Sequence, residues 1–189
     1  MIAINLRGTS GAGKSYLARR LLAHYPNRVP NMVAGRGTPI SAVYTGAPGP
    51  ILFALGHYEA EQGGGADTVS RADGFAAMEE AAKTGLTNIL WEGVIFSDEV
   101  PQTIVLSRSI EVHVILLTTP VKQCLADIRA RREIAGRKVK PLKEANTVNR
   151  ATAIDRVMTR LRLAQAPGLK LYKLDREEAY AKCVELLGL

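Results

Sequence analysis

Residues 2–22 read IAINLRGTSGAGKSYLARRLL, in which a short apolar run meets a glycine-rich turn and then an amphipathic helical pattern. Residues 8–15, GTSGAGKS, fit the phosphate-binding pattern of Gly, four residues, Gly, Lys and Ser or Thr, in the strand-to-helix context that it requires. Glycines allow positive torsions that turn successive N–H groups toward phosphate oxygens, and the helix N-terminus adds partial positive charge. The stretch therefore predicts a nucleotide-binding loop rather than a glycine-rich turn that matches the pattern by chance.

The side chains at the end of this loop have distinct expected roles. Lys14 would reach the β- and γ-phosphates of the nucleotide, and the Ser15 hydroxyl would coordinate the Mg²⁺ that bridges those phosphates. The residues expected to surround the triphosphate are Gly8, Ser10, Gly11, Ala12, Gly13, Lys14, Ser15 and Tyr16. We therefore expect ATP and Mg²⁺ as cofactors.

The length and composition of the chain favour one domain, residues 1–189, in the cytoplasm. A chain of 189 residues is long enough for one α/β domain with a buried core. No apolar run reaches the length of about 18 residues that indicates a membrane span, and no basic segment precedes the N-terminal apolar run as it would in a signal peptide. The net charge of +7 indicates phosphate-bearing partners, which include both nucleic acids and nucleotides.

Two segments after the first expected helix carry candidate features. Residues 40–44 and 51–55 are strand-like and flank TGAPGP, which predicts a β-hairpin inserted after the first helix, over residues 26–58. The following loop, residues 56–73, reads GHYEAEQGGGADTVSRAD and concentrates functional groups, of which Tyr58, Asp67, Arg71 and Asp73 are the candidates for substrate binding. Because loops carry function disproportionately, we interpret it as part of a substrate site, with a solvated surface loop as the alternative.

An acidic residue is expected beside the nucleotide. Residues 88–91, NILW, read as a buried strand that delivers Glu92 at its carboxyl end, where parallel sheets place chemistry. Glu92 could hold Mg²⁺ or its water, or orient an acceptor hydroxyl. The alternative is a structural carboxylate that caps a helix or pairs with a cation.

Basic residues concentrate in residues 129–143. The cluster includes Arg129, Arg132 and Arg137, with Gly136 as a candidate hinge, between two helical patterns. It resembles the lid of nucleoside monophosphate kinases, whose arginines close over the transferring phosphoryl group. A solvated basic face and a nucleic-acid contact strip are the other interpretations.

The alternation of strand and helix patterns indicates a doubly wound α/β domain with a parallel sheet, a P-loop domain of the nucleoside and nucleotide kinase type. Resemblance to nucleoside monophosphate kinases implies the strand order 2-3-1-4-5, which periodicity alone does not give.

Three stretches, RGTSGAGKS, GHYEAEQGGGADTVSRAD and NILWEGVIFS, resemble a family of phage-encoded P-loop kinases that includes 5-hydroxymethyluridine DNA kinases. The resemblance spans roughly residues 2 to 100, and its weight falls on GGGADTVSRAD and WEG because the first motif is common to many NTPases. It implies a phage protein that acts in the host cytoplasm and phosphorylates a base hydroxymethyl in DNA containing a modified pyrimidine. Separately, we expect a monomer or a homodimer.

A base hydroxymethyl is a poor nucleophile, so such a site needs a carboxylate to orient it and accept its proton. Asp67, Asp73 and Glu92 are the candidates, and Asp67 is the first choice because the glycines at 63–65 would bring it close to the base. Tyr58 would stack on the base and Arg71 would bind a flanking phosphate. A thymidylate-like or other small-molecule kinase, or a P-loop ATPase without an acceptor, would also explain the motifs.

Overall fold

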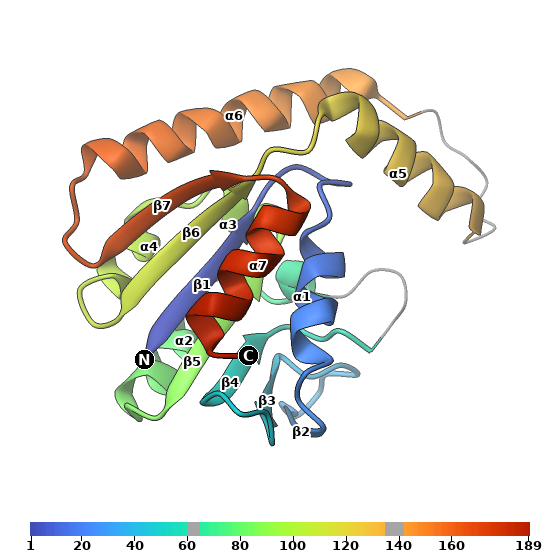
Figure 1. Cartoon of the computed structure of the whole chain (residues 1–189). Helices are drawn as coiled ribbons and strands as arrows, with labels where there is room; N and C mark the ends of the chain where they lie inside the picture. Colours follow the sequence, from blue (N-terminus) through green and yellow to red (C-terminus); the bar gives the residue numbers. More distant parts are fainter. Residues whose placement is uncertain (60–64, 135–141) are drawn as a thin grey trace.

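Five parallel strands form the centre of the computed structural model, which describes residues 1–59, 65–134 and 142–189 (Figure 1). These strands are β1 (Ile2–Arg7), β4 (Ile51–Leu55), β5 (Thr87–Glu92), β6 (Glu111–Leu117) and β7 (Leu169–Leu174). Within the seven-stranded sheet they lie in the order β4-β5-β1-β6-β7. Numbered among themselves along the chain, they have the order 2-3-1-4-5, so the predicted doubly wound topology is confirmed.

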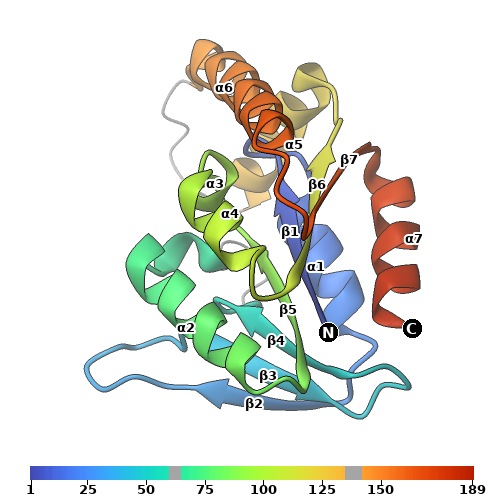
Figure 2. The same ribbon diagram turned by 90° about the vertical axis from the view of Figure 1, so that its left-hand side faces the viewer.

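Helices cover both faces of this sheet, as Figure 2 shows from its edge. Helices α1 (Lys14–Leu22) and α7 (Arg176–Leu187) pack on one face. The opposite face carries α2 (Arg71–Lys83), α3 (Val94–Ser97), α4 (Pro101–Leu106) and α6 (Glu144–Leu163). Helix α5 (Val121–Ile134) precedes α6, and both lie over the end of the sheet where β1 and β5 finish (Figure 1). The nucleotide-binding loop leaves β1 at this same end.

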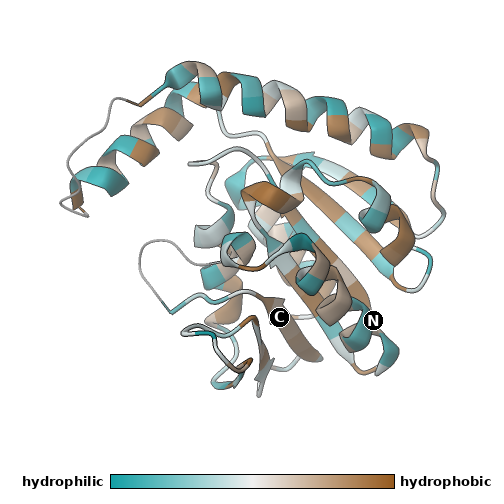
Figure 3. Ribbon diagram, turned by 180° about the vertical axis from the view of Figure 1, so that it is seen from behind, coloured by the Kyte–Doolittle hydropathy of each residue, from teal (hydrophilic) through white to brown (hydrophobic). Residues whose placement is uncertain are grey.

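The alternation of side chains along the strands builds two cores. In β1, Ala3 packs into the core under α2 and α6, whereas Ile4 and Leu6 pack into the core under α1 and α7. Successive side chains of a strand point to opposite faces, so a strand covered on both sides is largely apolar on both. Figure 3 shows the result: the central strands are hydrophobic, and hydrophilic residues lie on the outer surfaces of the helices.

The predicted hairpin is present, but it is not an insertion beside the sheet. Strand β3 (Ser41–Thr45) pairs antiparallel with β4, and the loop between them contains residues 46–50. Because β4 also pairs parallel with β5, it is an integral strand of the parallel sheet. The expectation of an insertion over residues 26–58 is wrong in this respect, and the additional elements are β3 and the edge strand β2 (Asn27–Asn31).

A buried arginine fixes the position from which the nucleotide-binding loop starts. Arg7 is fully buried at the end of β1 and donates hydrogen bonds to the carbonyl oxygen of Glu99 at 2.7 Å and to Oγ1 of Thr103 at 2.8 Å. Burial lowers the pKa of Arg7 to about 10, although Glu99 and Asp98 oppose that shift. The end of β1 is thereby tied to the segment that follows β5.

The basic segment predicted as a lid is described only at its two ends. Helix α5 ends at Ile134 and α6 begins at Glu144, so Gly136 and Arg137 lie outside the described residues. Among the helices that the structure describes, none has the length and apolar character needed to cross a membrane.

Candidate active site

The backbone of the phosphate-binding loop requires its glycines. Gly11 has φ +79° and Gly13 has φ +98°, both in the left-handed region that side chains disfavour. A Cβ at Gly11 would also overlap the carbonyl oxygen of Cys124 in α5, and a Cβ at Gly13 would come within 2.7 Å of Nε of Arg176. The loop is therefore packed closely against α5 and α7 as well as curved.

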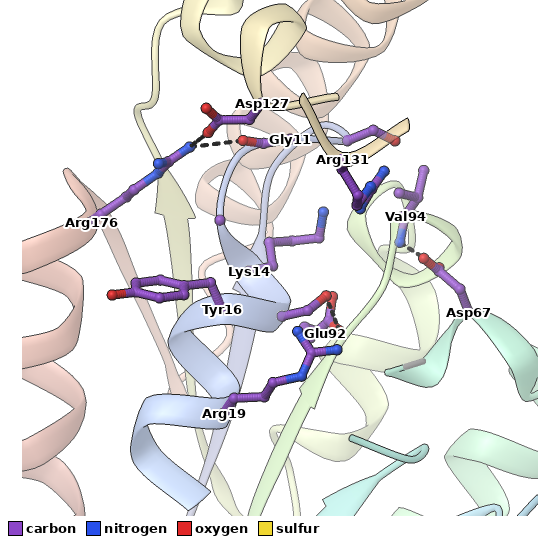
Figure 4. Close-up of a pocket in the computed structure, with 13 residues that line it drawn as sticks. Gly11, Lys14, Tyr16, Arg19, Asp67, Glu92, Val94, Asp127, Arg131 and Arg176 are labelled. Atoms are coloured by element: carbon purple, nitrogen blue, oxygen red, sulfur yellow. Dashed lines mark hydrogen bonds and ion pairs between the residues drawn. The ribbon is translucent and has the colours of Figure 1, made fainter. Parts of the chain in front are cut away.

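Lys14 lies within the curve of this loop (Figure 4). Its ammonium group donates hydrogen bonds to the carbonyl oxygens of Gly8 at 2.9 Å and Thr9 at 3.1 Å. Burial lowers the pKa of Lys14, and the negative charge of Glu92 opposes that shift. A phosphate that entered the loop would offer this cation a charged partner in place of two neutral carbonyls.

Ser15 and Glu92, the two predicted metal ligands, are in direct contact. Glu92 lies at the end of β5, where it is paired in register with Leu6 of β1, and the Ser15 hydroxyl donates to its Oε1 at 2.9 Å. Glu92 is almost fully buried, and this burial raises its pKa, although Lys14 and Ser15 oppose the shift. A carboxylate and a hydroxyl at this distance supply the oxygen ligands that Mg²⁺ prefers.

The backbone of Gly65 covers this carboxylate from the side of the substrate loop. Gly65 has φ +68°, and a Cβ built there would overlap Oε1 of Glu92. Its amide donates to the carbonyl oxygen of His57 at 2.5 Å in an isolated β-bridge. The glycine therefore allows the chain to approach Glu92 more closely than any side chain would permit.

A cavity of about 440 Å³ joins the loop to the acidic residues. It is lined by Ser10, Gly11, Gly13, Lys14, Ser15, Tyr16, Asp67 and Glu92, which were predicted, and by Arg19, Val94, Asp127, Arg131 and Arg176, which were not (Figure 4). Phosphate-binding groups and carboxylates thus face one space, as a transfer between two substrates requires.

Asp67 is held in this cavity by the first turn of α3. Its Oδ1 accepts hydrogen bonds from the backbone N–H groups of Val94 at 2.6 Å and Ile95 at 3.3 Å. These bonds fix the orientation of the carboxylate and join the short 3₁₀ turn Ala66–Thr68 to α3. Asp67 therefore lines the same cavity as Lys14 and Ser15 of the loop.

The other residues proposed for the substrate loop do not line this cavity. Tyr58 is buried in the core under α1, where it has no surface to offer a base, and burial raises its pKa well above the usual range. Asp73 accepts a hydrogen bond from the Ser70 hydroxyl at 2.8 Å at the start of α2, and it lines a separate cavity between α2 and the sheet edge. The structure therefore places neither Tyr58 nor Asp73 on the wall of the cavity that holds the loop and Asp67.

Arg71 contacts α3 instead of the cavity. It donates from Nε to the carbonyl oxygen of Ile95 at 2.6 Å and forms an ion pair with Asp98. Asp98 also pairs with Arg150 of α6 at 2.6 Å. One carboxylate therefore joins the start of α2 to α6.

The basic helix α5 presents different arginines from those predicted. Its buried face contains Cys124, Leu125 and Ile128, and Asp127 and Arg131, one turn apart, face the nucleotide loop. Arg129 points elsewhere and forms an exposed ion pair with Glu144. Arg132 lines a neighbouring groove rather than this cavity. The structure therefore places Arg131, and not Arg129, on the wall of this cavity.

Arg176 is a site residue that sequence reasoning missed. From the first turn of α7 it donates to the carbonyl oxygens of Gly11 at 2.8 Å and Ala12 at 3.1 Å. It also pairs with Asp127 at 2.5 Å. Partial burial acts to raise the pKa of Asp127. Hydrogen bonds from Arg176 and Gln123 outweigh this effect and hold the pKa below its usual value. No local pattern marks this residue, because its partners lie at the other end of the chain.

Comparison with known proteins places these residues in a wider context. No protein-family model matches the sequence. The chain is 31% identical over 185 residues to a 5-hmdU DNA kinase of Pseudomonas phage PaMx11, and the match covers 97% of this chain and 96% of that protein. The match therefore extends over nearly all of the helices and strands described above.

Proposed function

Because the chain belongs to the family of this phage 5-hmdU DNA kinase, we propose that it transfers the γ-phosphoryl group of ATP to the hydroxymethyl oxygen of 5-hydroxymethyldeoxyuridine in DNA. One observation carries the proposal: the phosphate-binding loop and the Asp67 and Glu92 carboxylates line a single cavity in a chain that matches this kinase over nearly its whole length.

The loop and its surrounding cations would bind the donor. The backbone N–H groups of the loop and Lys14 would hold the β- and γ-phosphates, with the Lys14 ammonium exchanging its contacts to Gly8 and Thr9 for phosphate oxygens. Arg131 projects into the same cavity and would offset charge on the γ-phosphoryl group. The electrostatic stabilisation that these groups give to the phosphoryl group is strongest in a site from which water is excluded.

Ser15 and Glu92 would hold Mg²⁺. The fit rests on their contact at 2.9 Å and on the burial of Glu92, whose negative charge a bound cation would balance. Bound there, Mg²⁺ would offset the negative charge that develops on the phosphoryl group during transfer.

Asp67 would act on the acceptor. As the hydroxymethyl oxygen forms its bond to the γ-phosphorus, the bond from that phosphorus to the β,γ-bridging oxygen breaks and ADP leaves. The hydroxyl proton passes to the Asp67 carboxylate. Asp67 suits this role better than Glu92, because Glu92 is engaged with Ser15 whereas Asp67 is oriented by Val94 and Ile95 on the wall of the same cavity.

Labelled ATP tests this function directly. The protein is incubated with γ-labelled ATP and one of three acceptors: an oligonucleotide with one hydroxymethyldeoxyuridine, the same oligonucleotide with thymidine, and a free nucleoside monophosphate. The two oligonucleotides differ by a single hydroxyl, so label on the first alone supports the proposal. Label on the free monophosphate alone would overturn it in favour of a nucleotide kinase.

A further inference from the structure

A second, larger groove opens beside the nucleotide cavity. It has a volume of about 950 Å³ and lies between α5, α6, the start of α3 and the nucleotide loop. It shares Ser10, Val94 and Arg131 with the nucleotide cavity, so the two spaces adjoin along one wall. A chain bound in this groove would therefore reach the γ-phosphate position without crossing the protein.

The groove is strongly basic. Arg131 and Arg132 of α5 line one side, and Lys143, the N-cap of α6, and Arg150 of α6 line the other. Of the described residues that line it, none is acidic and none is aromatic. It thus offers charge for phosphates but no ring on which a base could stack.

Polar side chains from α6 and its N-cap follow one another along the groove. Asn146, Thr147 and Arg150 lie three, four and seven residues after Lys143, the N-cap of α6, so these residues lie on one side of the helix. Arg150 is also paired with Asp98, which fixes its position at the groove wall. Lysine, arginine and asparagine are residue types that contact the phosphates of nucleic acids.

We propose that this groove binds the sugar-phosphate backbone of the acceptor DNA strand next to the target nucleotide. The inference rests on the proposed function and extends it by assigning the path of the strand. A single nucleotide would be accommodated by the nucleotide cavity alone and would not contact Lys143 or Arg150, which line the second groove and not that cavity. Contacts from the cations of this lining to phosphates carry no sequence information, so we expect binding in the groove to depend little on base sequence.

The test measures binding of a plain, dye-labelled single strand of about 20 nucleotides by fluorescence anisotropy as a function of salt. The variants are Lys143→Gln, Arg150→Gln and the double change. We expect Kd to rise about 3- to 10-fold for each. The plot of the logarithm of the association constant against log salt has a negative slope, and its magnitude should decrease by about 0.7 for each lost phosphate contact. Arg150→Lys should retain most of the slope, because it keeps the charge.

Arg160→Gln is the matched control, since Arg160 is an exposed arginine further along α6 and outside the groove. It should leave both Kd and slope unchanged. Thermal unfolding of each variant confirms that the fold is retained. The KM for ATP should stay within about twofold of wild type, because neither Lys143 nor Arg150 lines the nucleotide cavity.

Three results would overturn the groove assignment. The first is an unchanged Kd and salt slope in the double variant, and the second is no binding of plain DNA by the wild-type protein at low salt. The third is a rise in the KM for ATP that equals the loss of DNA binding, which would assign these cations to the donor. Because binding is measured without transfer, a failure to phosphorylate hydroxymethyldeoxyuridine would count against the proposed function and not against the groove.

Discussion

The Ser15 hydroxyl donates a hydrogen bond of 2.9 Å to Oε1 of Glu92, and so joins the first turn of α1 to the end of β5. The two residues are far apart in the sequence, but β1 and β5 are neighbours in the sheet. The strand order therefore brings the phosphate-binding loop and the buried carboxylate together before any ligand binds.

Replacement of Lys14 should separate catalysis from folding. Lys14→Met keeps a chain of similar length but removes the charge that would act on the γ-phosphoryl oxygens, so kcat should fall by about 100-fold or more. The far-ultraviolet circular dichroism spectrum should match that of the wild type. Transfer at the wild-type rate would contradict the assignment of the donor site.

Glu92 should give the stability of the ligand-free protein a specific pH dependence. Burial raises the pKa of Glu92 above 4.5, so the folded protein binds its proton more tightly than the unfolded chain does. The free energy of unfolding therefore decreases as the pH rises from the unfolded pKa through the folded pKa. Glu92→Gln removes this dependence.

Without Mg²⁺, we expect the Tm of Glu92→Gln to exceed that of the wild type at about pH 7–8, and the difference to shrink as the pH falls toward the unfolded pKa. The same variant should lose phosphoryl transfer. A difference in Tm that is constant across this pH range would argue against a raised pKa at this position.

Asp67→Asn should lower kcat with little change in the KM for ATP. The amide oxygen can still accept from the N–H groups of Val94 and Ile95, but the side chain can no longer take the acceptor proton. Loss of a general base costs about 10²- to 10⁴-fold in rate. Steady-state kinetics with the hydroxymethyldeoxyuridine oligonucleotide measure the effect.

Asp73→Asn provides the matched control for Asp67. Asp73 interacts with Ser70 at the start of α2 and lines a different cavity. Its replacement should destabilise the protein by no more than about 1 kcal/mol and leave kcat near the wild-type value. A larger kinetic effect at Asp73 than at Asp67 would reverse the two assignments.

Arg176→Met should weaken donor binding by displacing the nucleotide loop. Arg176 donates to the carbonyl oxygens of Gly11 and Ala12, so its loss removes the donor to Gly11 and leaves Ala12 with only the Thr119 hydroxyl. We expect the KM for ATP to rise about tenfold and kcat to fall by a similar factor, since a small displacement of a catalytic loop is costly. Arg176→Lys should restore little of the lost activity, because lysine lacks the planar guanidinium group that donates to both carbonyl oxygens at once. Unchanged kinetics in both variants would exclude a positioning role.

Two arginines of α5, two residues apart, should respond differently to substitution. Arg131 projects into the nucleotide cavity, so Arg131→Gln should lower kcat by about 100-fold. Arg129 forms an exposed ion pair with Glu144, so Arg129→Gln should change kcat by less than about twofold and stability by at most about 1 kcal/mol. Equal effects on kcat would show that α5 is oriented differently in the working enzyme.

Local patterns in the sequence were enough to locate the nucleotide loop and the doubly wound sheet. The loop motif specifies its own backbone geometry, and the apolar runs specify strands covered on both faces. Strand β2 was not predicted because Pro30 argues against a strand, although an edge strand tolerates proline. Asp73 was considered as a catalytic base, but Ser70 and Asp73 form a pattern typical of the start of a helix. That pattern gives the Asp73 carboxylate a structural explanation.

The remaining site residues depend on contacts between distant parts of the chain. The choice between Arg129 and Arg131 follows from the orientation of α5, for which the buried residues Cys124, Leu125 and Ile128 were a usable signal. Arg176 gave no signal, because its contacts with Gly11 and Ala12 exist only once α7 packs beside α1.

The close approach of Gly65 to Glu92 constrains how related sequences can diverge. Any side chain at position 65 would collide with the carboxylate, and the left-handed backbone there adds a second reason for glycine. A lineage that retains the acidic residue at the end of β5 must therefore also retain the glycine, whereas loss of the carboxylate would relax the steric part of that requirement. This contact joins Gly65 of the GGGAD motif to Glu92 of the WEG motif. Selection on that one pair of residues would therefore favour sequences that keep both motifs.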